Sequence, residues 1–253
     1  MLENSDHQDL GKRLEQYCYQ YFIPVEFFFE IINDQKVLPM LRGKGMEYHA
    51  FLLLQQQLNP SEWIVQKLNL SPQPGSPDQD IGITHRRTGQ ILSAESKSAV
   101  RGSMNSGLKS REYKAPHFKV KSHRSRSNIK LADTSNDRYR WDAFDILLTN
   151  PSNAIYAGKT LGDELELIDD PRLWDILSAH YKISTHEALI KAAHNDWRFV
   201  IPGEIADSNG FIPRTPVVYL ENDPHWQPLI HLESKIKEVV RQRHASSRKP
   251  PRN

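Results

Sequence analysis

The sequence predicts a single α/β or α+β domain in which helices flank several short strands. Apolar residues recur at helical spacing in several segments, and short apolar runs bounded by turn residues are typical of strands. The chain has 253 residues, and it shows no repeat with a period of 20–50 residues. We expect one domain over residues 1–245, followed by a basic, proline-containing tail over residues 246–253.

The first sixty residues carry three helical patterns. The first covers about residues 11–21, and the second is the apolar run "VEFFFEIIND" after Pro24. The third, "RGKGMEYHAFLLLQQQLNP", is the clearest, because its apolar residues recur at helical spacing and Asn59-Pro60 ends it. The recurring positions are Met46, Ala50, Leu53, Leu54 and Leu58.

A strand and a hairpin are expected after this third helix. The run "EWIVQKLNL" predicts a strand, and "SPQPGSP", with its three prolines, predicts a loop. The runs "DIGIT" and "QILSAES" predict two strands around "HRRTG", in which Gly89 suits a turn.

The second half of the chain mixes strands and helices. The run "WDAFDILLTN", from Trp141 to Asn150, predicts a central strand, and "WRFVIPG" and "TPVVYL" predict short strands. Helices are expected over "DPRLWDILSAHYKI", over "STHEALIKAAHNDW", and over "LIHLESKIKEVVRQRH". In the second of these, Ser184 and Glu187 form the pattern of a capping box.

The composition favours a cytoplasmic protein. No run approaches eighteen apolar residues, and the polar N-terminus lacks the apolar core of a secretory signal. The single cysteine, Cys18, excludes an internal disulfide and favours a reducing compartment.

The net charge of +2 conceals a basic segment over residues 98–140. This segment holds 11 Lys/Arg and 3 Asp/Glu, a charge of +8, so the rest of the chain carries −6. A basic block within an acidic remainder suggests a polyanionic partner. Aromatic residues within the segment, and the apolar strand that follows it, favour a folded segment over a solvated loop.

The predicted hairpin brings two acidic residues and a lysine together. If its turn is centred between Arg87 and Thr88, antiparallel partners have numbers that sum to 175, and Asp80 lies opposite Glu95. Lys97, two residues beyond Glu95, shares that face. Two adjacent carboxylates repel, and a divalent cation between them removes the repulsion. A slip of one residue would reverse the faces.

Such a site is suited to hydrolysis of a phosphodiester. Oxygen ligands suit Mg²⁺, which polarises a phosphoryl oxygen and lowers the pKa of a bound water. Lys97 can orient that water or stabilise its hydroxide form. The candidate catalytic residues are Asp80, Glu95 and Lys97, with Asp80 and Glu95 as metal ligands. Asp78 is the alternative to Asp80, although it would lie opposite Lys97.

The Asp/Glu-x-Lys pattern alone is weak, because roughly one or two matches are expected by chance in a chain of this length. This chain has four, and only Glu95–Lys97 ends an apolar strand with an aspartate upstream and a basic segment downstream. The others are Asp34–Lys36, Glu112–Lys114 and Glu233–Lys235. An exposed hairpin with an ordinary Glu–Lys pair is the structural alternative.

The residues "PDQDIG…QILSAESK" resemble the signature of the PD-(D/E)xK nuclease superfamily, and the chain as a whole resembles a type II restriction endonuclease. The resemblance implies a mixed central β-sheet flanked by helices, two acidic residues that bind Mg²⁺, and a lysine that assists the attacking water. It also matches Glu47, in "GKGMEYHA", to a helix glutamate that supports the metal site. A glutamate favoured by the helix dipole explains Glu47 equally well.

The resemblance also implies the partners. Double-stranded DNA would be the substrate, and a homodimer is expected because two active sites must meet two antiparallel strands. A cognate DNA methyltransferase is expected in the same prokaryotic cell.

The basic segment is the candidate DNA-recognition region. Arg and Lys neutralise phosphates and contact guanine edges, and Asn contacts adenine. The candidate DNA-binding residues are Arg101, Asn105, Lys109, Arg111, Lys114, Arg124, Arg126 and Lys130.

Two other functions fit the sequence. One is a non-catalytic DNA-binding protein, in which Asp80 and Glu95 are incidental. Two carboxylates facing a phosphate backbone weaken binding without a metal, which argues against it. The other is a repair or junction-resolving nuclease of the same superfamily. The Ser- and Asn-rich basic segment argues against it, because such a segment favours recognition of a base sequence.

Overall fold

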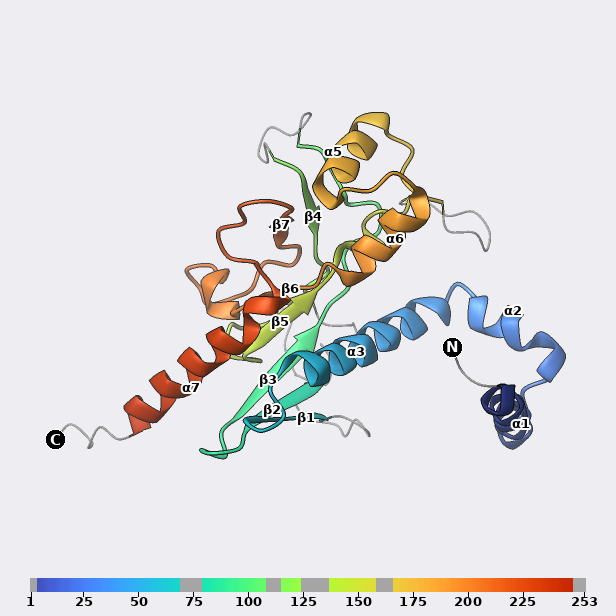
Figure 1. Cartoon of the computed structure of the whole chain (residues 1–253), viewed down its shortest axis with the longest axis horizontal. Helices are drawn as coiled ribbons and strands as arrows, with labels where there is room; N and C mark the ends of the chain where they lie inside the picture. Colours follow the sequence, from blue (N-terminus) through green and yellow to red (C-terminus); the bar gives the residue numbers. More distant parts are fainter. Residues whose placement is uncertain (1–3, 69–78, 108–114, 124–136, 158–165, 248–253) are drawn as a thin grey trace. The chain divides into compact units, whose positions relative to one another are not determined.

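The computed structural model describes residues 4–68, 79–107, 115–123, 137–157 and 166–247 (Figure 1). The chain divides into two compact units, Met1–Gly45 and Met46–Asn253, a division that the expected single domain over residues 1–245 did not include. None of the helices in the described part is long and apolar enough to cross a membrane.

The first unit is helical. It contains α1 (Asn4–Gln20), the 3₁₀ helix η1 (Val25–Phe27), α2 (Phe28–Asn33) and the start of α3 (Leu38–Gln57). These confirm the three helical patterns, although α3 begins before its expected start. Pro39 lies in its first turn, where a missing N–H is tolerated. Among residues 9–45, only Cys18 is buried.

The second unit is built on a six-stranded sheet in the order β1-β2-β3-β5-β6-β8. The pairing of β3 with β5 is parallel and the other four pairings are antiparallel, so the sheet is mixed. This confirms the expected mixed α+β fold with helices against a sheet. The strands are β1 (Trp63–Lys67), β2 (Ile81–His85), β3 (Ile91–Ser96), β5 (Ile146–Thr149), β6 (Arg198–Val200) and β8 (Gln227–Pro228).

The strand expected over residues 141–150 is central but short. All four residues of β5 are buried, as in a strand covered on both faces. Ile146 and Leu148 belong to a core that includes residues of α3 and α7 (Leu232–Ser247), whereas Leu147 belongs to a core that includes residues of α5 (Pro171–Tyr181) and α6 (His186–Asn195). Because successive side chains of β5 point to opposite faces of the sheet, the strand lies between two layers of helices, α3 and α7 on one face and α5 and α6 on the other.

Two expectations about the helices are corrected. The N-cap of α6 is Thr185, whose hydroxyl accepts a hydrogen bond from the Ala188 N–H at 3.2 Å, so Ser184 does not cap this helix. The C-terminal helix α7 continues to Ser247, so the expected tail is helical at residues 246–247, and residues 248–253 lie outside the described part.

Smaller elements complete the unit. A second sheet pairs β4 (His117–Lys119) with β7 (Val217–Tyr219). The sequence predicted neither β4 nor β8. The described part of the unit also contains the 3₁₀ helices η2 (Pro151–Asn153), η3 (Pro202–Glu204) and η4 (Leu229–His231).

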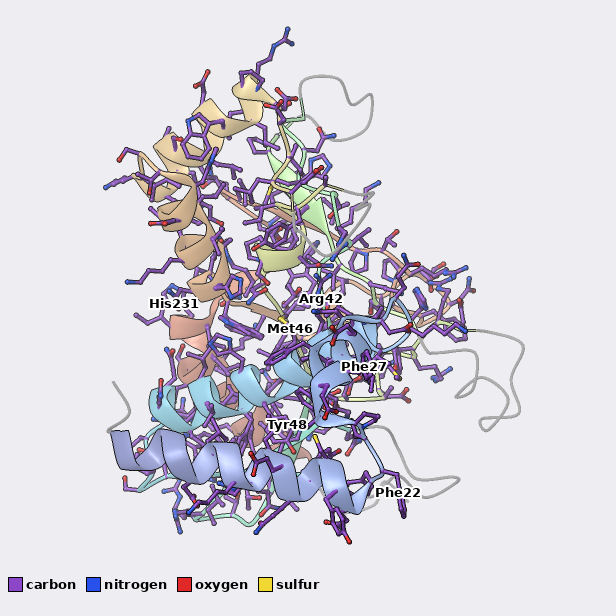
Figure 2. All side chains as sticks on the ribbon, turned by 90° about the vertical axis from the view of Figure 1, so that its right-hand side faces the viewer. Phe22, Phe27, Arg42, Met46, Tyr48 and His231 are labelled. Atoms are coloured by element: carbon purple, nitrogen blue, oxygen red, sulfur yellow. The ribbon has the colours of Figure 1, made fainter. Side chains whose placement is uncertain are left out.

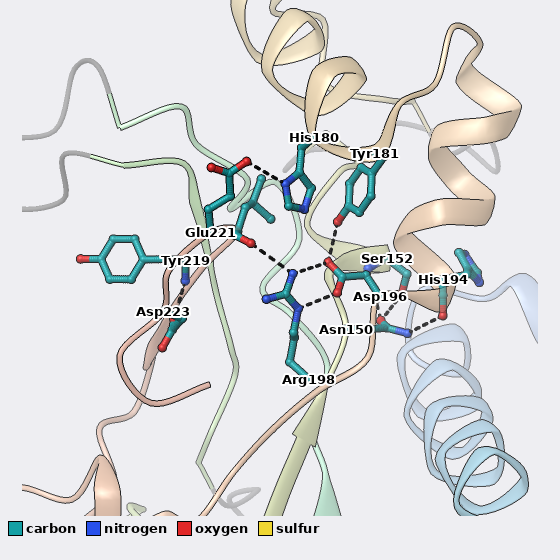
Figure 3. Close-up of polar contacts among 11 residues, drawn as sticks. Asn150, Ser152, His180, Tyr181, His194, Asp196, Arg198, Tyr219, Glu221 and Asp223 are labelled. Carbon is teal, nitrogen blue, oxygen red and sulfur yellow. Dashed lines mark hydrogen bonds and ion pairs between the residues drawn. The ribbon is translucent and has the colours of Figure 1, made fainter. Parts of the chain in front are cut away.

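A partly buried polar network links α5, β6 and the segment after β7 (Figure 3). The Tyr181 hydroxyl donates to Asp196 Oδ2 at 2.7 Å, and Arg198 Nε donates to Asp196 Oδ1 at 2.5 Å. Arg198 Nη2 also donates to the Leu220 carbonyl at 3.2 Å. Burial and the Asp196 carboxylate raise the pKa of Tyr181, so its hydroxyl stays protonated and remains a donor.

We expect Asp196→Ala to lower the free energy of unfolding by about 3–5 kcal/mol, because it leaves the Arg198 guanidinium buried without its carboxylate. Urea unfolding would measure this. The double variant Asp196→Ala/Arg198→Met should lose less stability, since it buries no uncompensated charge. A double variant that is less stable than Asp196→Ala would contradict this account of the network.

Candidate active site

The register of the β2–β3 hairpin is the one predicted from the sequence. Ile81 pairs with Ala94, Gly82 with Ser93, and Thr84 with Ile91, so the numbers of partners sum to 175. Gly89 has φ +69°, the left-handed conformation that glycine adopts without strain in the connecting turn. Continued by one residue, the same register places Asp80 opposite Glu95.

Asp80 is held at the start of β2. Its carbonyl accepts a hydrogen bond from the Leu68 N–H at 3.1 Å, which continues the β1–β2 pairing. Its carboxylate Oδ2 accepts a hydrogen bond from the Ser96 N–H at 3.1 Å, across the hairpin. Only 5% of this residue is exposed, so an ionisable group is buried at the end of two neighbouring strands.

Glu95 and Lys97 form a close ion pair beside it. Lys97 Nζ lies 2.5 Å from Glu95 Oε1 and 5.2 Å from the centroid of the Tyr139 ring. The Glu95 side chain is 2% exposed and that of Lys97 is 20% exposed. Burial alone would lower the pKa of Lys97, but the Glu95 carboxylate raises it above its ordinary value. Lys97 is therefore a cation at neutral pH, suited to donate hydrogen bonds rather than to accept a proton.

The pKa of Asp80 is raised. Burial is the main cause and the charge of Glu47 adds to it, whereas the Ser96 N–H, Lys97 and Lys67 lower it. Glu47 therefore lies near enough to Asp80 to act on its charge. Residues from α3, β1, β2 and β3 meet at this point.

A second lysine, which was not predicted from the sequence, acts on the charge of Asp80. Lys67 ends β1, and its Nζ lies 3.4 Å from Glu47 Oε2. Period-two alternation places Lys67 on the same face as Trp63 and Val65, which pack in the core. A lysine on the inward-facing side of a predicted strand is the sequence signal that could have drawn attention to it.

The carboxylates suit Mg²⁺, but they do not form a preformed cage. Within the described residues, no group of three or more His, Cys, Asp or Glu side chains could hold a metal ion. Mg²⁺ is commonly bound by one or two carboxylates together with waters and substrate phosphates, so the pair Asp80 and Glu95 matches the number of protein carboxylates that such a site needs. The raised pKa of Asp80 indicates a buried negative charge that a cation would stabilise.

The structure describes only part of the predicted site. Asp78 lies outside the described residues, so the choice between Asp78 and Asp80 stays open. Two predicted DNA-binding residues are described. Arg101 is partly exposed in the turn after Lys97, and Asn105 is exposed, with its side-chain oxygen accepting from the Gly107 N–H at 2.8 Å. Lys109, Arg111, Lys114, Arg124, Arg126 and Lys130 lie outside the described residues.

The described ends of the basic segment are folded against the protein. Ala99 forms a bridge with Val120, and Asn105 forms one with His117. The segment also supplies β4, which pairs with β7 to form the second sheet. Tyr139, near its C-terminal end, is buried and contacts Lys97.

No family model matches the chain, and neither the curated proteins nor the solved structures contain a match.

We expect Asp80→Asn to be more stable than the wild type at neutral pH in EDTA. The folded pKa of Asp80 lies above the unfolded one. The folded state therefore binds more protons, and the free energy of unfolding falls as pH rises from about 3.9 through the raised pKa. Asn can still accept from the Ser96 N–H. Urea unfolding across pH 3–8 would show a smaller fall for the variant.

Asp207 provides a matched control, because its pKa is shifted in the direction opposite to that of Asp80. A hydrogen bond from the Phe211 N–H, and then Arg138, lower the pKa of Asp207. Asp207→Asn should therefore be less stable than the wild type at neutral pH and should differ least at pH 3. An Asp80→Asn variant that behaved like Asp207→Asn would contradict the assignment of a destabilising charge to Asp80.

Proposed function

We propose that the protein is a Mg²⁺-dependent, sequence-specific double-stranded DNA endonuclease of the type II restriction class, with a restriction-endonuclease-like fold. One observation carries the proposal: the buried carboxylates Asp80 and Glu95 and the cationic Lys97 lie together at the end of one hairpin. An exposed Glu–Lys pair would not require that burial. A cytoplasmic location in a prokaryotic cell with a cognate DNA methyltransferase belongs to the same proposal.

Each residue has a role in hydrolysis of the phosphodiester. Bound Mg²⁺ would supply polarisation of a phosphoryl oxygen and a lowered pKa for its water ligand. Asp80 and Glu95 would hold the ion. Lys97, kept protonated by Glu95 and held against the Tyr139 ring, donates a hydrogen bond to the attacking water or to a phosphate oxygen. The Ser96 N–H keeps Asp80 directed toward β3.

We expect Glu95→Ala and Lys97→Ala to lose site-specific cleavage by at least about 10²–10³-fold, the loss typical of one electrostatic group removed from an active site. Plasmid and phage DNA would be incubated with each protein in Mg²⁺ and in EDTA. Wild type should give discrete bands in Mg²⁺ alone. Thermal unfolding would show that both variants fold.

Lys235→Ala is the matched control, because Glu233–Lys235 repeats the Asp/Glu-x-Lys pattern on the C-terminal helix α7. Lys235 pairs with Glu204 at 2.8 Å, and this variant should cleave like the wild type. Nicking of branched DNA without discrete bands would favour the junction-resolving nuclease. DNA binding without cleavage, unchanged in Glu95→Ala, would favour the non-catalytic binder.

We further propose that the enzyme is a homodimer that associates through its first unit. The described residues of this unit expose six aromatic side chains, by 51–95% each: Tyr17, Tyr19, Tyr21, Phe22, Phe27 and Phe29. Figure 2 labels Phe22 and Phe27, at 95% and 60% exposure. At about 200 Å² per aromatic side chain, the six expose roughly 800 Å². A standard interface buries about that area on each partner.

The double variant Phe27→Glu/Phe29→Glu should raise the dimer dissociation constant by about thirtyfold or more, the effect of losing interface anchors. Light scattering after size-exclusion chromatography, over a range of concentrations, would measure it. Ile230→Glu is the control, because Ile230 is 72% exposed in the second unit and should leave the dimer intact. A wild-type protein that is monomeric at micromolar concentration would contradict the proposed interface.

A further inference from the structure

Lys97 is held by two groups that come from different parts of the chain. Its Nζ lies 2.5 Å from Glu95 Oε1, two residues earlier in the sequence, and 5.2 Å from the centroid of the Tyr139 ring, which lies over 40 residues later. Glu95 alone would let the ammonium swing about the carboxylate, because the four-carbon stem of lysine is flexible. A second contact, from a segment distant in the sequence, restricts that motion.

The Tyr139 ring is a rigid support for the ammonium. The residue is 4% exposed, and its ring packs edge to face against Phe144, with the two centroids 5.3 Å apart. Its carbonyl accepts a hydrogen bond from the Ile212 N–H at 2.9 Å, and Arg138 Nε, on the preceding residue, donates to the Ile212 carbonyl at 3.1 Å. Both the backbone and the side chain of Tyr139 are therefore held by groups other than Lys97.

Glu95 and Tyr139 leave part of the ammonium open. A lysine ammonium has three N–H donors. One side of it meets the Glu95 carboxylate, and the ring face, which attracts a cation, covers another. The Lys97 side chain is 20% exposed and that of Glu95 is 2% exposed, so the pair meets solvent through the lysine. A remaining N–H can therefore reach a water or a phosphate oxygen on the exposed side.

We propose that Tyr139 is the positioning residue of Lys97, and that its ring sets the direction in which the ammonium presents its remaining N–H donors to the substrate. This inference rests on the proposed function. The ring face is the group that acts, because the ammonium lies over it, and phenylalanine offers the same face. Tyr139 is buried, so it acts through Lys97 and not by contact with DNA.

The first measurement follows the Lys97 side chain in the full-length protein, without metal or DNA. Nuclear magnetic resonance of ¹³C-labelled lysine would record the ε-CH₂ signals, and the signal that Lys97→Arg removes is that of Lys97. The face of an aromatic ring shifts the signals of nuclei above it upfield. We expect this upfield shift in the wild type and in Tyr139→Phe, and we expect Tyr139→Leu to lose it.

Cleavage of DNA in Mg²⁺ should follow the same order. Tyr139→Leu should lower kcat by about 10²-fold, the loss typical of a catalytic group displaced by about 1 Å. KM should not change, because Tyr139 is buried and does not contact the DNA. Tyr139→Phe keeps the ring and should cleave as the wild type does.

Phe144→Leu is the matched control. It breaks the same aromatic pair and removes a similar volume from the core, so urea unfolding should show about the same loss of stability as in Tyr139→Leu. It leaves the Tyr139 ring against Lys97, because the hydrogen bond from Ile212 still holds the Tyr139 backbone. The Lys97 signal and kcat should therefore stay those of the wild type.

The possible results separate this inference from the proposed function. A Lys97 signal that Tyr139→Leu does not move, or a Tyr139→Leu variant that cleaves like the wild type, would overturn the role of Tyr139 and leave the proposed nuclease standing. An equal loss of cleavage in Phe144→Leu or in Tyr139→Phe would overturn the role of the ring face. A wild type that does not cleave DNA, although its Lys97 signal depends on the ring, would overturn the proposed function and leave the ring contact standing.

Discussion

In the pairing of β2 with β3, Ile81 lies opposite Ala94, and the candidate site depends on this alignment. A shift of one residue would turn Asp80 and Glu95 toward opposite faces of the sheet. The alignment is held from both sides, because Ile81, Ile83, Leu92 and Ala94 are all buried in the core shared with α3 and α7. The apolar residues therefore fix the positions of the polar ones, and packing rather than polar attraction brings the carboxylates together.

The polar groups in turn destabilise the fold that holds them. Burial raises the pKa of Asp80, which means that its ionised form is less stable inside the protein than in water. The charges of Lys97 and Lys67 offset part of this penalty, whereas the charge of Glu47 adds to it. Under the proposed function, a cation held by Asp80 and Glu95 would remove this penalty. The sheet, buried on both faces at β5, supplies the stability that such an arrangement requires.

The local features of the fold could be predicted from the sequence, and the contacts between distant segments could not. The β2–β3 register follows from one turn with Gly89 and from alternation over a few residues. Ser184 and Thr185 are both good N-caps, and only the backbone decides between them. The pairing of β4 with β7 joins segments about 100 residues apart. The strand β7 was predicted, but the three residues of β4 carry too little pattern to be recognised.

The candidate site shows the same difference between local features, which could be predicted, and contacts between distant segments, which could not. Asp80, Glu95 and Lys97 are close in sequence, so their proximity follows from one hairpin. Lys67 lies near Asp80 because β1 pairs with β2, and the Tyr139 ring lies against Lys97 although about 40 residues separate them in sequence. Neither contact could be predicted from a local sequence pattern. The glutamate on α3 was found through family resemblance, but its partner Lys67 was not.

The backbone of Lys97 is tied to the central strand at both of its polar groups. Its N–H donates to the Leu148 carbonyl at 2.9 Å, and its carbonyl accepts from the Thr149 hydroxyl at 2.7 Å. Both partners are buried, so no local fluctuation of a surface loop can release this residue. Displacing the lysine requires opening the middle of the sheet, which places its amide among those that exchange with solvent only when the second unit unfolds as a whole.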